Sequence, residues 1–162
     1  MRWQCLLLIG VMPIASASAG APAGCADLRG TPIHFNVSWQ ADIKPLFNEL
    51  ISPTGRCTSC HIGDPPAGGL DLSDNNFDAI YKVVGSVVQA GSPLTSRLFE
   101  KVNCSDPNGG LQMPLGGDPL TIAERELIYD WIAQGAYGED PNSVDGPIAR
   151  DFIFRDGSES IR

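Results

Sequence analysis

Five consecutive residues, Cys57 to His61, constrain this chain more than any other segment. They read Cys-Thr-Ser-Cys-His, so two thiols lie three residues apart and an imidazole follows directly. This is the pattern to which haem c is attached, with a thioether to each cysteine and the histidine as proximal ligand of the iron. The motif therefore predicts covalent haem at Cys57 and Cys60, with His61 as an iron ligand.

Two other kinds of site use a C-x-x-C pair. A dithiol redox centre lies between a strand and a helix in a βαβ unit, and no such pattern surrounds Cys57. A structural zinc site needs two further ligands, for which the chain offers only Cys25, Cys104 and His34, at no recognised spacing. Both readings stay open from the sequence, with haem attachment as the leading hypothesis.

The N-terminus has the features of a secretory signal peptide. A basic residue precedes an apolar run at 5–14, and small residues at 15–19 offer cleavage sites. The run is too short to span a membrane as a helix. A retained anchor is one alternative, and lipidation at Cys25 is another. We expect residues 1–19 to be a signal peptide and the protein to be periplasmic or otherwise exported from a bacterium, with no membrane span after cleavage.

The charge of the mature chain limits its partners. Cleavage after residue 19 of 162 leaves 143 residues, which suits one domain. Ten lysines and arginines then face nineteen aspartates and glutamates, a net charge of minus nine. Nucleic acid and anionic membranes are therefore unfavourable partners. We expect a redox partner protein with a basic face, although acidity that serves only solubility explains the charge equally well.

The number of cysteines predicts a disulfide. The signal peptide contains Cys5, and haem would take two of the remaining four, which leaves Cys25 and Cys104. Two spare thiols usually pair in an oxidising compartment. We therefore expect a bridge between Cys25 and Cys104, the alternative being two free thiols.

Apolar spacing predicts an all-α domain. Helical stripes occur at Ile43, Leu46, Phe47 and Leu50, at Phe77, Ile80, Tyr81 and Val84, at Leu94, Leu98 and Val102, and at Leu127, Ile128, Trp131 and Ile132. Ser92 and Pro93 predict the start of the third helix. Thr121 and Glu124 form a capping box at the start of the fourth, and Gly135 follows its end.

The flanking segments have different patterns. Residues 33–39 alternate between apolar and polar, which predicts a short strand or extended arm with His34 pointing away from the apolar face. Residues 138–162 are rich in Gly, Asp and Ser and predict a loose tail. We therefore expect an N-terminal arm at 20–38, a domain at 39–137 and a tail at 138–162.

Met113 is the candidate for the sixth ligand of the iron. Signal-peptide removal leaves it as the only methionine, within a Gly- and Pro-rich loop at 108–117 that is suited to bringing a thioether to the iron. A core methionine is one alternative, and ligation by His34 or an open coordination position are the others. We expect the second ring nitrogen of His61 to donate to a carbonyl in the Pro65-Pro66 loop.

Two axial protein ligands predict one-electron transfer rather than reaction at the iron. The alternatives are a haem enzyme or gas-binding sensor with a labile sixth ligand, and a non-catalytic haem-containing module of a larger assembly. Three basic residues, Arg56, Arg97 and Lys101, are candidate partners of the haem propionates or else surface charges.

Residues 39–136 resemble a single-haem cytochrome c domain of the planctomycete type. The segments that carry the resemblance are, in chain order, 42–46, 57–61, 68–72, 92–98, 113–114, 120–132 and 135–136. The resemblance implies cytochrome c-like helices wrapped around one covalent haem and a role as an electron carrier. It also implies that Cys57 and Cys60 attach the haem, that His61 is the proximal ligand and that Met113 is the distal ligand.

Overall fold

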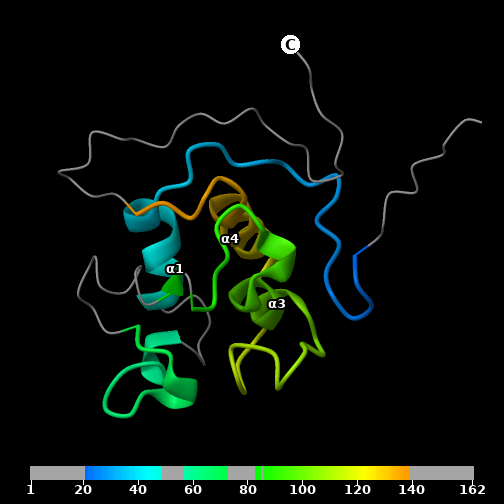
Figure 1. Cartoon of the computed structure of the whole chain (residues 1–162). Helices are drawn as coiled ribbons and strands as arrows, with labels where there is room; N and C mark the ends of the chain where they lie inside the picture. The colour runs from blue at the N-terminus through cyan, green and yellow to red at the C-terminus, as the bar shows by residue number, and fades with distance from the viewer. Residues whose placement is uncertain (1–20, 49–56, 73–82, 85, 139–162) are drawn as a thin grey trace, which may run out of the picture.

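The computed structural model describes residues 21–48, 57–72, 83–84 and 86–138 (Figure 1). Several predicted features lie outside these residues. They are the signal peptide at 1–19, the tail from 139 onward, Arg56, and the apolar positions Leu50, Phe77, Ile80 and Tyr81.

Three α-helices form the frame of the described residues. They are α1 (Lys44–Asn48), α3 (Arg97–Asn103) and α4 (Ile122–Ala133). Shorter turns occur at Trp39–Ile43, which is π-helical, and at Cys57–Ser59, Ala67–Gly69 and Pro93–Thr95, which are 3₁₀. Apart from isolated bridges, no strand occurs in the ranges given above. The described part is therefore mostly helical, in agreement with the predicted all-α class.

The core lies between α1 and α4. Trp39 and Trp131, each 1% exposed, pack with ring centroids 5.3 Å apart, and Phe47 lies edge-on to Trp39 at 5.7 Å. Ile43 and Ile132 are fully buried beside them. Burial of such side chains contributes about 1.5–3 kcal/mol each, so this cluster joins the first helix to the last.

The helix α4 follows the sequence prediction closely. The Thr121 side chain accepts a hydrogen bond from the Glu124 backbone, and the Glu124 carboxylate accepts one from the Thr121 backbone at 2.6 Å. Three residues of the predicted apolar stripe are buried, namely Ile128, Trp131 and Ile132, and the fourth, Leu127, is half-buried. The predicted start and buried face of this helix are confirmed. No helix of the described residues is long and apolar enough to cross a membrane.

The third predicted helix is interrupted at Ser96. A 3₁₀ turn ends at Thr95, and α3 begins only at Arg97. The buried Ser96 hydroxyl donates to the Ser92 carbonyl at 2.9 Å and accepts from the Gln89 amide at 2.9 Å, while its backbone is extended. The prediction was therefore wrong for Leu94, which precedes the break and is 68% exposed. Side chain to backbone hydrogen bonds of serine compete with the helical pattern in this way.

The segment 33–38 is not a strand. The backbone amide of His34 donates to the Asp130 carboxylate at 2.8 Å, and its carbonyl accepts from Gln134 at 2.6 Å. The Val37 amide donates to the Gln134 side chain at 3.1 Å. These backbone groups are satisfied by the side chains of Asp130 in α4 and of Gln134 at its C-cap, so no partner strand is needed. The segment is an irregular arm that bends at residues 35–36, where Asn36 has a positive φ of 54°, and the prediction of a strand was wrong.

A disulfide joins the arm to the end of α3. Cys25 and Cys104 are bonded, which is the pairing expected from the number of cysteines. Ala26 donates to the Asn103 carbonyl at 3.1 Å, and Ser105 donates to the Gly24 carbonyl at 2.8 Å. The arm is therefore fixed at two places, to α3 here and to α4 through His34.

Candidate functional site

The Cys57–His61 motif forms a single helical turn beside α1. The amides of Cys60 and His61 both donate to the Cys57 carbonyl, at 3.2 and 2.9 Å. The Thr58 hydroxyl donates to the Phe47 carbonyl of α1 at 3.4 Å. This turn places Cys57 and His61 on one side of the motif, because residues four apart in a helical turn are neighbours.

The loop after His61 folds back onto the motif and orients the imidazole. The Ala67 amide donates to the Cys60 carbonyl at 3.1 Å, and the buried Leu72 donates to the His61 carbonyl at 2.6 Å. His61 Nδ1 lies 2.9 Å from the Ala67 carbonyl oxygen, to which it donates. Its Nε2 has no partner among the described residues and is left as an acceptor. The prediction of an acceptor in the loop that contains Pro65 and Pro66 is confirmed, and the acceptor is the residue after Pro66.

The two cysteines of the motif differ in their surroundings. Cys57 packs against the hydrophobic core, whereas Cys60 is exposed, and the two thiols are not bonded to one another. Desolvation by burial raises the pKa of the Cys57 thiol to about 11. A thiol that stays protonated at neutral pH is a weak nucleophile in thiol exchange. Cys57 is therefore a poor attacking thiol at neutral pH.

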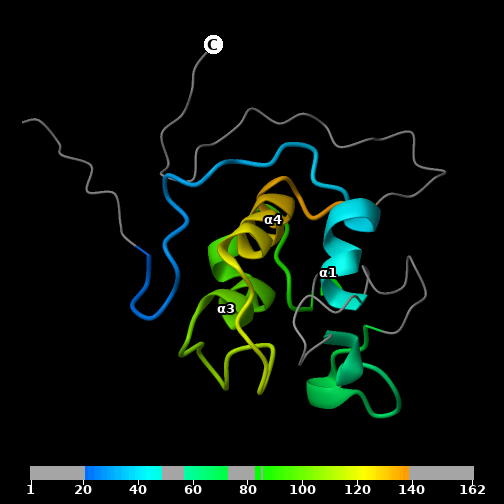
Figure 2. The same ribbon diagram turned by 180° about the vertical axis from the view of Figure 1, so that it is seen from behind.

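Met113 lies at the same end of the molecule as the motif. The chain segments 57–72 and 104–120 both lie below the helices, as Figures 1 and 2 show. Met113 is half-buried and packs against the core cluster that Cys57 also contacts. Its amide donates to the Lys101 carbonyl at 2.8 Å, which joins the loop to α3.

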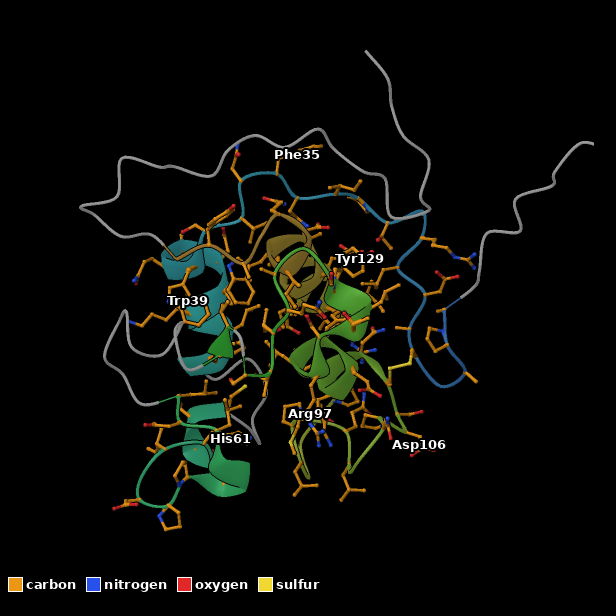
Figure 3. The ribbon with its side chains drawn as sticks, viewed as in Figure 1. Phe35, Trp39, His61, Arg97, Asp106 and Tyr129 are labelled. Carbon is orange, nitrogen blue, oxygen red and sulfur yellow. A yellow bond between two sulfur atoms is a disulfide. The ribbon has the colours of Figure 1, made fainter. Side chains whose placement is uncertain are left out.

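His34 lies elsewhere. Its Nδ1 is 3.2 Å from the Asp130 carboxylate. Figure 3 shows its neighbour Phe35 at the opposite end of the molecule from His61. The fold therefore brings Met113, and not His34, to the end where the motif lies.

Of the three predicted basic residues, Arg97 and Lys101 have partners within the protein, and Arg56 lies outside the described residues. Arg97 donates to the Gly109 carbonyl at 3.0 Å, and Lys101 donates to the carbonyls of Gly109 and Leu111, each at 3.2 Å. Sequence reasoning missed this role. The signal that was available is the Gly109-Gly110 pair, which allows a close approach of other groups to the backbone.

These residues fit a covalent haem. The described residues supply two free thiols at the required spacing and an imidazole whose second nitrogen is fixed by a carbonyl. A zinc site is not supported, because no group of three or more His, Cys, Asp or Glu side chains in the described part of the chain is placed to hold a metal ion.

Comparison with known proteins agrees with this geometry. Residues 57–114 match the family model described as Planctomycete cytochrome C. No curated protein and no solved structure matches the chain. The matched segment begins at Cys57 and includes Cys60, His61 and Met113, and it supports haem binding and electron transfer rather than enzyme activity. The segment 57–114 is thus a match to the planctomycete-type cytochrome c family, which confirms the resemblance stated from the sequence.

Proposed function

We propose that the protein is an exported c-type cytochrome that carries single electrons. Cys57 and Cys60 hold one covalent haem, and His61 and Met113 are its axial ligands. When bound, the haem supplies reversible one-electron chemistry at its iron. The observation that supports the proposal most directly is the hydrogen bond from His61 Nδ1 to the Ala67 carbonyl. This bond leaves Nε2 available to bind iron, and the two thiols of the same motif are free to attach haem.

Each residue has a distinct part. Cys57 attaches the haem on the core side, where the thiol already packs against apolar residues, and Cys60 attaches it on the exposed side. The Ala67 carbonyl fixes the plane of the His61 ring and makes the lone pair of Nε2 a stronger ligand for iron. Met113 supplies a thioether, which raises the reduction potential relative to a second imidazole.

The surroundings support a carrier. In the proposed arrangement, the helices and the segments 57–72 and 104–120 would surround one haem. With a net charge of minus nine after signal cleavage, the partner is a protein with a basic face. Electron exchange with it slows as salt is raised, because the Debye length falls to about 8 Å at physiological ionic strength.

A redox titration followed by visible absorption tests the ligand assignment. Met113→Ala lowers the reduction potential and removes the weak red absorption of sulfur-ligated ferric haem. Two variants serve as controls: Leu115→Ala, which removes an exposed side chain from the same loop, and His34→Ala, which removes the other histidine. Both controls keep the potential and the absorption of the unaltered protein. If the unaltered protein lacks this absorption and its potential changes in His34→Ala but not in Met113→Ala, the ligand is His34.

Carbon monoxide binding separates a carrier from an enzyme or sensor. A ferrous protein with both axial positions filled binds carbon monoxide slowly, because the Met113 thioether must leave first. We expect slow binding at neutral pH and negligible peroxidase turnover. Rapid stoichiometric binding together with peroxide turnover would move the assignment to the haem enzymes or gas sensors.

A further inference from the structure

The loop that carries Met113 lies against a polar face of α3. Arg97, Glu100 and Lys101 are spaced at i, i+3 and i+4, so their side chains leave the helix on one side. All three bond to the backbone of residues 108–111. Figure 3 shows Arg97 at the same end of the molecule as His61.

The contacts are specific and converge on the loop carbonyls. The Gly109 oxygen accepts from Arg97 Nη2 at 3.0 Å and from Lys101 Nζ at 3.2 Å. Lys101 Nζ also donates to the Leu111 carbonyl at 3.2 Å. The Asn108 amide donates to Glu100 Oε1 at 2.6 Å. The loop therefore has hydrogen bonds to charged groups at three positions before Met113, namely 108, 109 and 111, and such bonds are about twice as strong as neutral ones.

The two glycines of the loop make this approach feasible. A Cβ on Gly110 would lie 2.8 Å from Lys101 Nζ, and one on Gly109 would lie 3.2 Å from Arg97 Nη2. Gly109 also has a positive φ of 79°, which side-chain-bearing residues rarely adopt. The positive φ of both residues and the two cations beside them favour glycine at these positions.

The opposite face of α3 is fixed in the core. Leu98, Phe99 and Val102 are buried, and Phe99 lies edge-on to Tyr129 of α4 with centroids 5.2 Å apart. The helix is therefore a rigid support, and the charged side chains connect that support to the loop.

We propose that Arg97 and Lys101 are positioning residues for Met113, which hold the carbonyls of Gly109 and Leu111 on α3 and so keep the ligand loop closed. This inference rests on the proposed function, in which Met113 is the sixth ligand. It assigns the two cations to the loop backbone rather than to haem propionates.

The test compares holoprotein variants that differ in these bonds. Lys101→Gln and the double variant Arg97→Gln/Lys101→Gln replace the charged donors by shorter, neutral amides, and Lys101→Arg keeps the charge and can donate to the same carbonyls. Arg29→Gln is the matched control, since it removes one exposed charge that forms a salt bridge with Asp27, away from this loop. Far-ultraviolet circular dichroism checks that each variant is folded.

Two readouts report on the loop. Hydrogen exchange of the Met113 amide follows its bond to the Lys101 backbone carbonyl, which the side-chain changes do not remove. The rate of carbon monoxide binding to the ferrous protein follows release of the thioether. We expect both rates to rise about tenfold in Lys101→Gln, equivalent to about 1.4 kcal/mol, and further in the double variant. We expect Lys101→Arg and Arg29→Gln to match the unaltered protein.

The outcomes distinguish this inference from the proposed function. Unchanged amide exchange and carbon monoxide binding in the double variant would overturn the positioning role, while the Met113→Ala result would still stand for the ligand. A shifted potential with unchanged Met113 exchange would also overturn it, in favour of propionate binding. Absence of the red absorption from the unaltered protein would instead overturn the ligand assignment itself.

Discussion

Removal of the Cys25–Cys104 disulfide is expected to be the most destabilising change outside the core. The perturbation is the double variant Cys25→Ala/Cys104→Ala, because a single substitution would leave a reactive thiol. The backbone contacts beside the bridge remain available in the variant: Ala26 to Asn103 and Ser105 to Gly24. The main effect is therefore on the unfolded chain.

The magnitude follows from the length of chain that the bridge closes. The two cysteines are 79 positions apart, so the crosslink restricts a loop that includes α1 and the whole Cys57–His61 motif. The chain-entropy relation for a loop of this size gives about 4.5 kcal/mol at ~25 °C. Small domains have a total stability of about 5–15 kcal/mol, so the loss is a large share of it.

Urea unfolding of the holoprotein measures this difference. With a slope of about 2 kcal/mol per molar urea, the midpoint of the variant falls by about 2 M. The reduced form of the unaltered protein is the control, and it should unfold near the variant. A midpoint shift below about 0.5 M would refute the loop-entropy argument. Two reactive thiols in the unfolded, non-reduced holoprotein would refute the pairing itself.

Two further predictions concern stability and ionisation. Thr121→Ala removes the side-chain cap of α4 and should lower the free energy of unfolding by about 1 kcal/mol. The control is Ser92→Ala, at a turn whose start has no side-chain cap bond, and it should change the free energy of unfolding by less than about 0.5 kcal/mol. Equal losses of the two variants in urea titrations would contradict the cap assignment. Hydrogen bonds from Arg29 lower the pKa of Asp27 to about 2 from its ordinary 3.8, so the contribution of the pair is present above pH 3.8 and is lost as the pH falls through 2. A carboxyl titration by NMR should show this midpoint and its return toward 3.8 in Arg29→Gln, and an unchanged midpoint in that variant would contradict the cause.

Local signals in the sequence predicted the features that depend on a few neighbouring residues. The capping box of Thr121 and Glu124 is such a feature, because both partners lie within one turn. The buried stripe of α4 is another, since helical period alone places Ile128 and Ile132 on one face. The cysteine pairing followed from counting and not from geometry.

Features that depend on tertiary contacts were not predictable in this way. Ser96 interrupts the third helix because its hydroxyl bonds to Gln89, seven residues earlier. His34 contacts Asp130, 96 positions away, and nothing in the alternation of residues 33–39 indicates that partner. The contacts of Arg97 and Lys101 with the ligand loop are of the same kind, because a charge pattern does not distinguish a solvated cation from one that binds a carbonyl.

The mass of the denatured protein tests the central claim most directly. The protein is expressed with its signal peptide in a bacterium that can attach haem c. It is then unfolded, and its mass is measured under conditions that leave thioether bonds intact. We expect the mass of the mature chain plus that of one haem. When Cys57 and Cys60 are both replaced by Ala, we expect the mass of the mature chain alone. An unmodified chain from the same host would contradict the assignment of this motif to haem.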